Sequence, residues 1–149
     1  MAKTQQFCTF FLKSQFFGVP VQQVLEVIRY QEMTRVALVP HVIRGLINLR
    51  GQIVMVVDLR RRFGMEDRSE SELPINVVVR TDDGAVSFLV DEIGDVLEVE
   101  EGCFEPPPIT LKGEARKLVR GVYKLQERLL LVLDTERTVS GGEAARTVQ

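Results

Sequence analysis

Residues 40–59 read PHVIRGLINLRGQIVMVVDL, and the rest of the chain is best interpreted outward from this stretch. Positions 53–57 form a continuous apolar run of Ile, Val, Met, Val and Val, which is typical of a strand covered on both faces. Arg50 and Gly51 precede the run and have the composition of a tight turn, because glycine adopts positive φ at no steric cost. We therefore predict a central strand over residues 52–59 that follows a turn.

Two arginine-glycine pairs occur in this stretch, Arg44-Gly45 and Arg50-Gly51, and Asn48 between them can hydrogen-bond within its own bend. A guanidinium is costly to bury without a partner, so we expect Arg50 to point outward and to present several donors on a rigid support. Glycine provides only backbone geometry. Gly45 and Gly51 are therefore interpreted as residues that shape the loop.

Composition places the chain among ordinary globular proteins: 149 residues, 45% hydrophobic and 27% charged. A formal net charge of -2 gives no overall field for nucleic acid or an anionic membrane. Cys8 and Cys103 fit no metal-ligand or redox spacing, and the apolar patch at residues 7–12 is too short for a signal peptide or a membrane span. We expect a cytoplasmic protein with free thiols, no metal and no cofactor.

Short strands separated by glycine, proline and polar turns follow one another along the chain. The predicted strands cover residues 6–12, 15–19, 24–30, 35–39, 52–59, 75–81, 85–90, 95–100, 119–125 and 129–133. Turns at residues 82–84 and 126–128 are expected to join two hairpins, and helical turns are expected at 21–25 and at 58–64, the second with Asp58 as its N-cap. This pattern favours an all-β protein built as a barrel or a pair of barrels. Residues 65–74 are expected to form a mobile polar loop, and residues 140–149 a disordered tail.

Catalytic motifs are missing from the sequence. His41 is the single histidine and has no recognised nucleophile motif near it, so we interpret it as an exposed turn residue. There is no phosphate-binding loop, dinucleotide fingerprint or Cys-x-x-Cys pair. The run Arg60-Arg61-Arg62 lacks interleaved aromatic residues for nucleic-acid binding and is interpreted as a solvated turn. We predict that the protein is not an enzyme.

The 40–59 stretch resembles the signature of the chemotaxis coupling proteins, the CheW family. The residues that carry the resemblance are Pro40, Ile43, Gly45, Asn48, Arg50, Gly51 and Val57-Asp58-Leu59, and it extends to residues 17–19, 24–27, 88–91, 95–97, 121–122 and 129–133. It implies two small five-stranded SH3-like barrels packed together, with short helical turns. These barrels would form one domain over residues 1–139 that divides near residues 65–75.

The resemblance also implies a function. Family members are non-enzymatic adaptors that couple the cytoplasmic tip of a methyl-accepting chemoreceptor to the regulatory domain of a CheA-type sensor histidine kinase in bacterial chemotaxis. Arg50 is then expected on the receptor-binding surface, and Val24, Glu26 and Asn48 are expected at receptor- or kinase-binding positions. For Val24 and Glu26 the alternative is an edge strand with one charge that discourages aggregation. We expect no nucleic acid, no membrane insertion and a monomer in isolation.

Other functions stay open at this point. A small β-barrel could bind nucleic acid, or it could hold a small ligand or substrate in a concave pocket. Domains of this family also serve twitching, gliding or other receptor pathways. The sequence does not say which receptor or kinase is the partner, and residues 65–74 could set that specificity.

Overall fold

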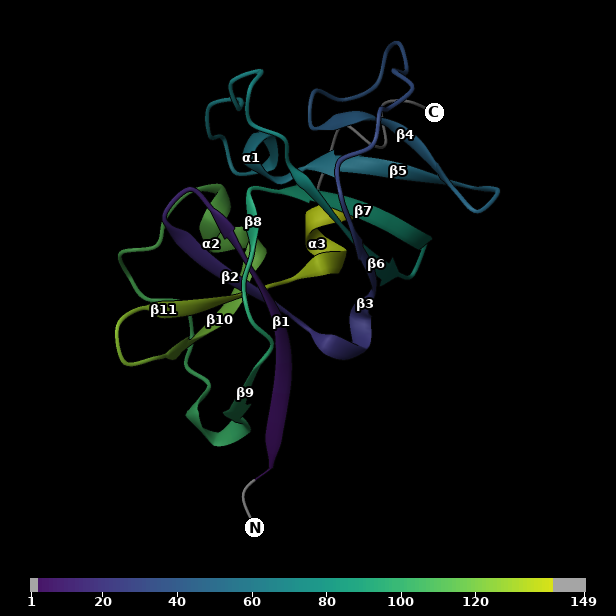
Figure 1. Ribbon diagram of the computed structural model, residues 1–149. Coiled ribbons are helices and arrows are strands. Elements are labelled where there is room, and N and C mark those ends of the chain that lie inside the picture. The colour runs from purple at the N-terminus through teal and green to yellow at the C-terminus, as the bar shows by residue number, and fades with distance from the viewer. Residues whose placement is uncertain (1–2, 141–149) are drawn as a thin grey trace.

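The computed structural model describes residues 3–140 and contains two β-sheets with short helices around them (Figure 1). The strands are β1 (Thr4–Leu12), β2 (Gln15–Pro20), β3 (Val24–Ile28), β4 (Ile43–Leu49), β5 (Gln52–Asp58), β6 (Ile75–Thr81), β7 (Gly84–Val90), β8 (Glu92–Ile93), β9 (Leu97–Glu100), β10 (Val119–Lys124) and β11 (Leu129–Leu133). The helical segments are η1 (Val21–Gln23), α1 (Leu59–Arg62), η2 (Glu101–Cys103), α2 (Glu114–Leu118) and α3 (Thr135–Ser140). The disordered tail was predicted from residue 140, and all of it beyond that residue lies outside the described residues.

Strands that are distant in sequence combine to form each sheet. The six-stranded sheet has the order β10-β11-β2-β1-β8, with β9 also paired to β1, and the five-stranded sheet has the order β3-β6-β7-β5-β4. Pairing is antiparallel except between β11 and β2 and between β5 and β7. The chain passes from the first sheet to the second after β2 and returns after β7.

Three apolar clusters account for the packing. The largest lies between the sheets and includes Phe10 and Phe17 from one sheet and Val77 and Phe88 from the other. Each sheet also has its own smaller cluster, around Leu130 in the six-stranded sheet and around Val56 in the five-stranded sheet. Each sheet therefore buries apolar side chains on both faces, which explains the continuous apolar runs in the sequence.

Most of the predicted elements are confirmed. The β6–β7 and β10–β11 hairpins form, η1 follows Pro20, and Asp58 caps α1 by accepting a hydrogen bond from the amide of Arg60. Strand β5 lies inside its sheet between β7 and β4, as expected. However, only its second half is covered on both faces, because Ile53 near the hairpin tip is 61% exposed.

Two predicted strands differ from the structure. Residues 35–39 form no strand; only an isolated bridge joins Thr34 to Leu46, and Leu38 adopts φ of 60° just before Pro40. A left-handed residue followed closely by proline interrupts extended pairing. The strand predicted over 95–100 begins only at Leu97, and β8 precedes it as a separate short strand.

The all-β class is confirmed, but closed SH3-like barrels are not, because no backbone pairing among residues 3–140 closes either sheet. Residues 65–74 contain no helix or strand and connect α1 to β6, which belongs to the same sheet as β5. Their mobility, and a division into subdomains near residues 65–75, stay predictions. Within the described part of the chain, no helix has the length and apolar character needed to cross a membrane.

Candidate functional site

The β4–β5 hairpin ends in a two-residue turn made by Arg50 and Gly51. Leu49 pairs with Gln52, and the two turn residues have φ of 51° and 86°. Positive φ at both central positions defines a type I′ turn, which matches the twist of the flanking strands. Gly51 adopts the predicted conformation at little cost, whereas Arg50 occupies a region that L-residues rarely enter.

Asn48 belongs to the turn itself. Its side-chain Oδ1 accepts a hydrogen bond of 2.8 Å from the amide of Gly51. Asn48 is an exposed residue, and its side-chain oxygen is used to hold the turn. Whether Asn48 also contacts a partner stays a prediction.

The guanidinium of Arg50 is bound by Glu26 on β3. Arg50 Nη1 donates to Glu26 Oε2 over 2.7 Å, and Nη2 donates to Oε1 over 2.5 Å. This two-point geometry is the strongest form of an arginine–carboxylate contact. The hydrogen bond from Arg50 lowers the pKa of Glu26, and the same bond raises the pKa of Arg50. The side chains are 76% and 23% exposed, so Arg50 is held in place yet open to solvent.

This ion pair connects the two edges of the five-stranded sheet. Glu26 lies on edge strand β3, and Arg50 lies at the tip of the hairpin that contains the other edge strand, β4. The sheet must therefore curl so that its edges approach, although no backbone pairing joins them among the described residues. We predicted from the sequence that Arg50 and Glu26 lie at binding surfaces, but not that they form an ion pair with each other.

Strand β3 presents an apolar edge on either side of Glu26. Val24 is half-buried against the core between the sheets, whereas Leu25 and Val27 are each 44% exposed. A β-bulge between Val24 and Glu26 shifts the register with β6. Sequence reasoning missed Leu25 and Val27. The signal was available, because a glutamate between two aliphatic residues on an edge strand leaves those residues on the opposite face.

Gly45 shapes a different part of the site. A Cβ atom at this position would lie 2.6 Å from the carbonyl oxygen of Thr34, far inside contact distance. The close approach exists because Thr34 and Leu46 exchange backbone hydrogen bonds of 2.9 Å. Gly45 therefore lets the connection between β3 and β4 lie against β4, whereas a Cβ at Gly51 would meet nothing within 4 Å.

The arginine run was misinterpreted from the sequence. Arg60 and Arg62 are buried, and only Arg61 is partly exposed, with its guanidinium bound to Asp67 and to the carbonyl of His41. Arg60 binds Asp91, and Arg62 binds Glu114 and the carbonyl of Thr138 in α3. This is not a solvated turn, because each side chain has partners from distant parts of the chain.

The described residues offer little for catalysis. His41 is exposed, as predicted, and Cys8 and Cys103 are free thiols. Burial raises the pKa of the Cys8 thiol, which makes it less reactive. Among residues 3–140 no group of three or more His, Cys, Asp or Glu side chains is arranged to hold a metal ion.

Comparison with known proteins shows which family this chain resembles along nearly its whole length. The profile of the CheW-like domain family matches residues 6–143. A chemotaxis protein CheW from Klebsiella aerogenes is 33% identical over 141 residues, covering 95% of this chain and 85% of the relative. One from Thermotoga maritima is 30% identical over 131 residues, covering 88% and 85%. The crystal structure of the scaffolding protein TtCheW from Thermoanaerobacter tengcongensis superposes with a TM-score of 0.79 at 26% identity, covering 93% of this chain and 92% of that one.

Proposed function

The chain belongs to the CheW-like domain family of chemotaxis scaffold proteins, and we propose that it is a non-enzymatic adaptor. In this proposal it couples the cytoplasmic tip of a methyl-accepting chemoreceptor to the regulatory domain of a CheA-type histidine kinase. In this proposal the protein is cytoplasmic, does not insert into the membrane and needs no cofactor. It is a monomer when it is separated from its partners.

The Arg50–Glu26 pair carries the proposal. An arginine at φ of 51° whose guanidinium is fixed by a carboxylate has already lost much of its rotamer freedom, so it loses less on binding. It remains 76% exposed, and Leu25 and Val27, the neighbours of Glu26 on β3, present apolar surface on the other face of that edge strand. A fixed arginine at a sheet edge that also carries exposed aliphatic side chains has the composition of an interface hot spot.

The receptor is the partner that we assign to this surface. The tip of a receptor is helical, and a helix binds through an apolar face with polar flanks. Leu25 and Val27 can meet the apolar face, while Arg50 and Glu26 can meet polar flanking groups of either sign. The kinase then binds elsewhere, and the adaptor acts by positioning the two partners.

The test combines the protein with a receptor fragment and a CheA-type kinase. Kinase autophosphorylation should rise only when all three proteins are present, since an adaptor changes proximity and not chemistry. Arg50→Ala should abolish the rise, whereas Arg120→Ala, an exposed arginine on β10 of the other sheet, should leave it unchanged. Stimulation of the kinase without receptor, by catalytic amounts of this protein, would refute the adaptor function.

The structure gives less support to the nucleic-acid alternative. That alternative was based on a small β-barrel, and the one basic run of the sequence does not add to it, because Arg60 and Arg62 are buried in ion pairs. A CheW-like adaptor of another motility or receptor pathway stays the second candidate, because its surface would use the same residues. Binding assays with receptor tips from each pathway would separate the two.

A further inference from the structure

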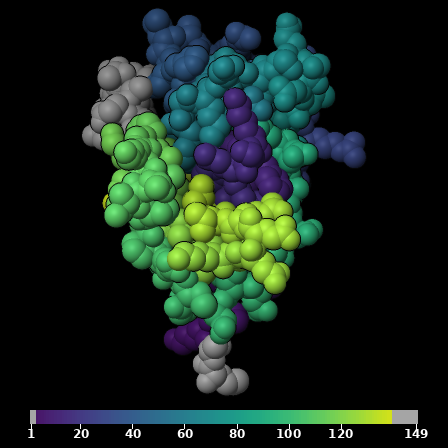
Figure 2. Space-filling view, turned by 90° about the vertical axis from the view of Figure 1, so that its left-hand side faces the viewer, coloured from purple at the N-terminus to yellow at the C-terminus, as the bar shows by residue number. Residues whose placement is uncertain are grey.

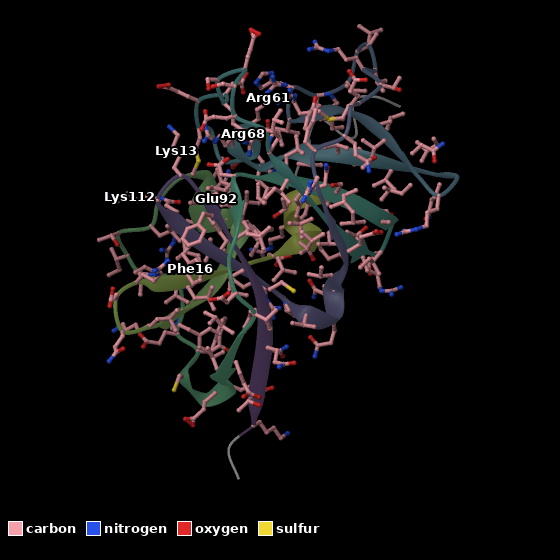
Figure 3. All side chains as sticks on the ribbon, viewed as in Figure 1. Lys13, Phe16, Arg61, Arg68, Glu92 and Lys112 are labelled. Carbon is pink, nitrogen blue, oxygen red and sulfur yellow. The ribbon has the colours of Figure 1, made fainter. Side chains whose placement is uncertain are left out.

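A buried group of charges lies where the two sheets meet, and its centre is Asp91. This residue stands between β7 of the five-stranded sheet and β8 of the six-stranded sheet. Its Oδ2 accepts a 2.7 Å hydrogen bond from the backbone amide of Lys13, in the β1–β2 turn. From the opposite side it accepts hydrogen bonds from Arg60 of α1, over 2.8 Å to Nη2, and from Arg68, over 2.8 Å to Nε. Figure 3 shows Lys13 near Arg68, although Lys13 lies in a turn of the six-stranded sheet and Arg68 in the connection from α1 to β6 of the other sheet.

Arg68 extends the group to a second carboxylate. Its Nη1 donates to Asp58 Oδ1 over 3.0 Å, and its Nη2 donates to the carbonyl of Leu89 over 3.3 Å. The side chain of Arg68 is 4% exposed, and those of Asp58 and Asp91 are 0% and 13% exposed. One planar guanidinium thus bridges two carboxylates, which a lysine ammonium with its single nitrogen cannot reproduce with the same geometry.

The backbone of Lys13 supports the same interpretation. Lys13 adopts φ of 56° in a two-residue turn, a conformation that favours glycine. A lysine persists in this conformation only when the surrounding structure holds it there. The hydrogen bond from its amide to Asp91 is such a restraint. In Figure 2 the purple N-terminal strands reach the teal residues of the other sheet on this face.

We propose that Arg68 and Asp91 are positioning residues that fix the orientation of one sheet relative to the other, and that they act on partner binding without touching a partner. The apolar cluster between the sheets is non-directional and tolerates small rotations, whereas hydrogen bonds to fixed carboxylates do not. The apolar contacts hold the sheets together, and the charges set their angle. The statement about partner binding rests on the proposed function.

Amide hydrogen exchange tests the restraint on the unmodified protein. The control is the amide of Gly51, which is also bound by a side chain in a two-residue turn, but only by Asn48 of its own hairpin. We expect the Lys13 amide to exchange at least tenfold more slowly than that of Gly51, because its acceptor, the Asp91 carboxylate, is itself held by Arg60 and Arg68 from the other side of the junction. If the Lys13 amide exchanges as fast as the Gly51 amide, the proposal is overturned. The experiment does not depend on the folding of any variant.

Spin labels measure the angle directly. In a Cys8→Ser, Cys103→Ser background, labels at Asp83→Cys in the β6–β7 turn and Glu127→Cys in the β10–β11 turn report on the two sheets from exposed sites. The labelled protein without further substitutions should give one narrow distribution of distances between the two labels. Arg68→Lys and Asp91→Asn should each broaden it while circular dichroism stays native. Arg61→Lys is the matched control, since Arg61 binds Asp67 within the same sheet's connection and should leave the distribution narrow.

Affinity for a receptor fragment separates this proposal from the function on which it rests. Arg68→Lys should weaken binding at least fivefold although Arg68 is buried, and Arg61→Lys should not weaken it. A narrow, unshifted distribution in folded Arg68→Lys and Asp91→Asn would refute the positioning role. If the unmodified protein does not bind the fragment, the proposed function fails, and the label distances still decide whether these residues set the angle.

Discussion

Two arginine–carboxylate systems in this protein have the same chemistry and opposite surroundings. Arg50 and Glu26 form a pair at the solvent-exposed edge of one sheet, with side chains 76% and 23% exposed. Arg68 binds Asp58 and Asp91 at the junction of the sheets, where Asp58 is fully buried. Water screens the first pair, so it adds little to stability and remains open to a partner. The second is costly to disturb, because a carboxylate left unpaired there would have no solvent.

The largest effect is expected when the buried system loses Asp58. Asp58→Ala removes the cap of α1 and leaves Arg44 and Arg68 without that carboxylate, which should destabilise the protein by about 3–5 kcal/mol. Glu26→Ala removes the carboxylate of the exposed pair and should change the free energy of unfolding far less. Urea unfolding of both variants measures the difference. Equal losses would show that burial does not distinguish the two systems.

The exposed system should matter for binding instead. Arg50→Glu should weaken binding to a receptor fragment by at least about tenfold, as expected when an interface arginine at a hot spot is lost. Glu26→Arg combined with Arg50→Glu restores an ion pair with its charges exchanged. If Arg50 meets the receptor, this double variant stays weak. Full recovery of affinity in the double variant would mean that the pair only holds the hairpin to β3.

Glycine positions in the hairpin sharpen the comparison further. Gly45→Ala should cost about 1–3 kcal/mol, because its Cβ would lie 2.6 Å from the carbonyl oxygen of Thr34 and backbone must move. Gly51→Ala meets no atom within 4 Å and suffers only from its φ of 86°, so we expect a smaller loss. Thermal unfolding ranks the two variants. A larger loss for Gly51→Ala would indicate that the turn conformation matters more than packing of the β3–β4 connection.

Acid should act weakly but selectively on the buried system. Burial acts to raise the pKa of Asp91, but the hydrogen bonds from Arg60 and Lys13 and the charge of Arg68 outweigh it, so the pKa lies below its usual value. A carboxylate with a lowered folded-state pKa contributes stability above its unfolded pKa of about 3.9, and this contribution disappears as the pH falls through the folded pKa.

Asp91→Asn therefore tests this pH dependence. As the pH falls below about 4, the free energy of unfolding should decrease more steeply for the unmodified protein than for Asp91→Asn. Glu72 and Arg60, the other charged groups near this carboxylate, are the same in both proteins. Urea unfolding at a series of pH values between neutrality and acid gives the slopes. Parallel slopes would show that Asp91 does not contribute.

Local features were predicted well from the sequence. The turn at Arg50 and Gly51, the cap at Asp58 and the hairpin turn at residues 82–84 all depend on residues within a few positions of one another. Backbone conformation and short-range hydrogen bonds decide such features, and residue type alone restricts them. The interior position of β5 also followed from its apolar run, since such a run is stable only when covered.

The pairing of charges was decided only by the tertiary structure. Arg50 and Glu26 are 24 positions apart, and Arg60 and Asp91 are 31 apart, so no local pattern connects them. Positions 60–62 are three consecutive arginines of identical chemistry, yet Arg60 and Arg62 are buried and Arg61 is not. The sequence determined most of the strands and the tight turns between them, although it did not predict β4 and placed a strand at residues 35–39 that does not form. The curl and packing of the sheets determined which charges meet, because burial and partner distance are properties of the assembled fold.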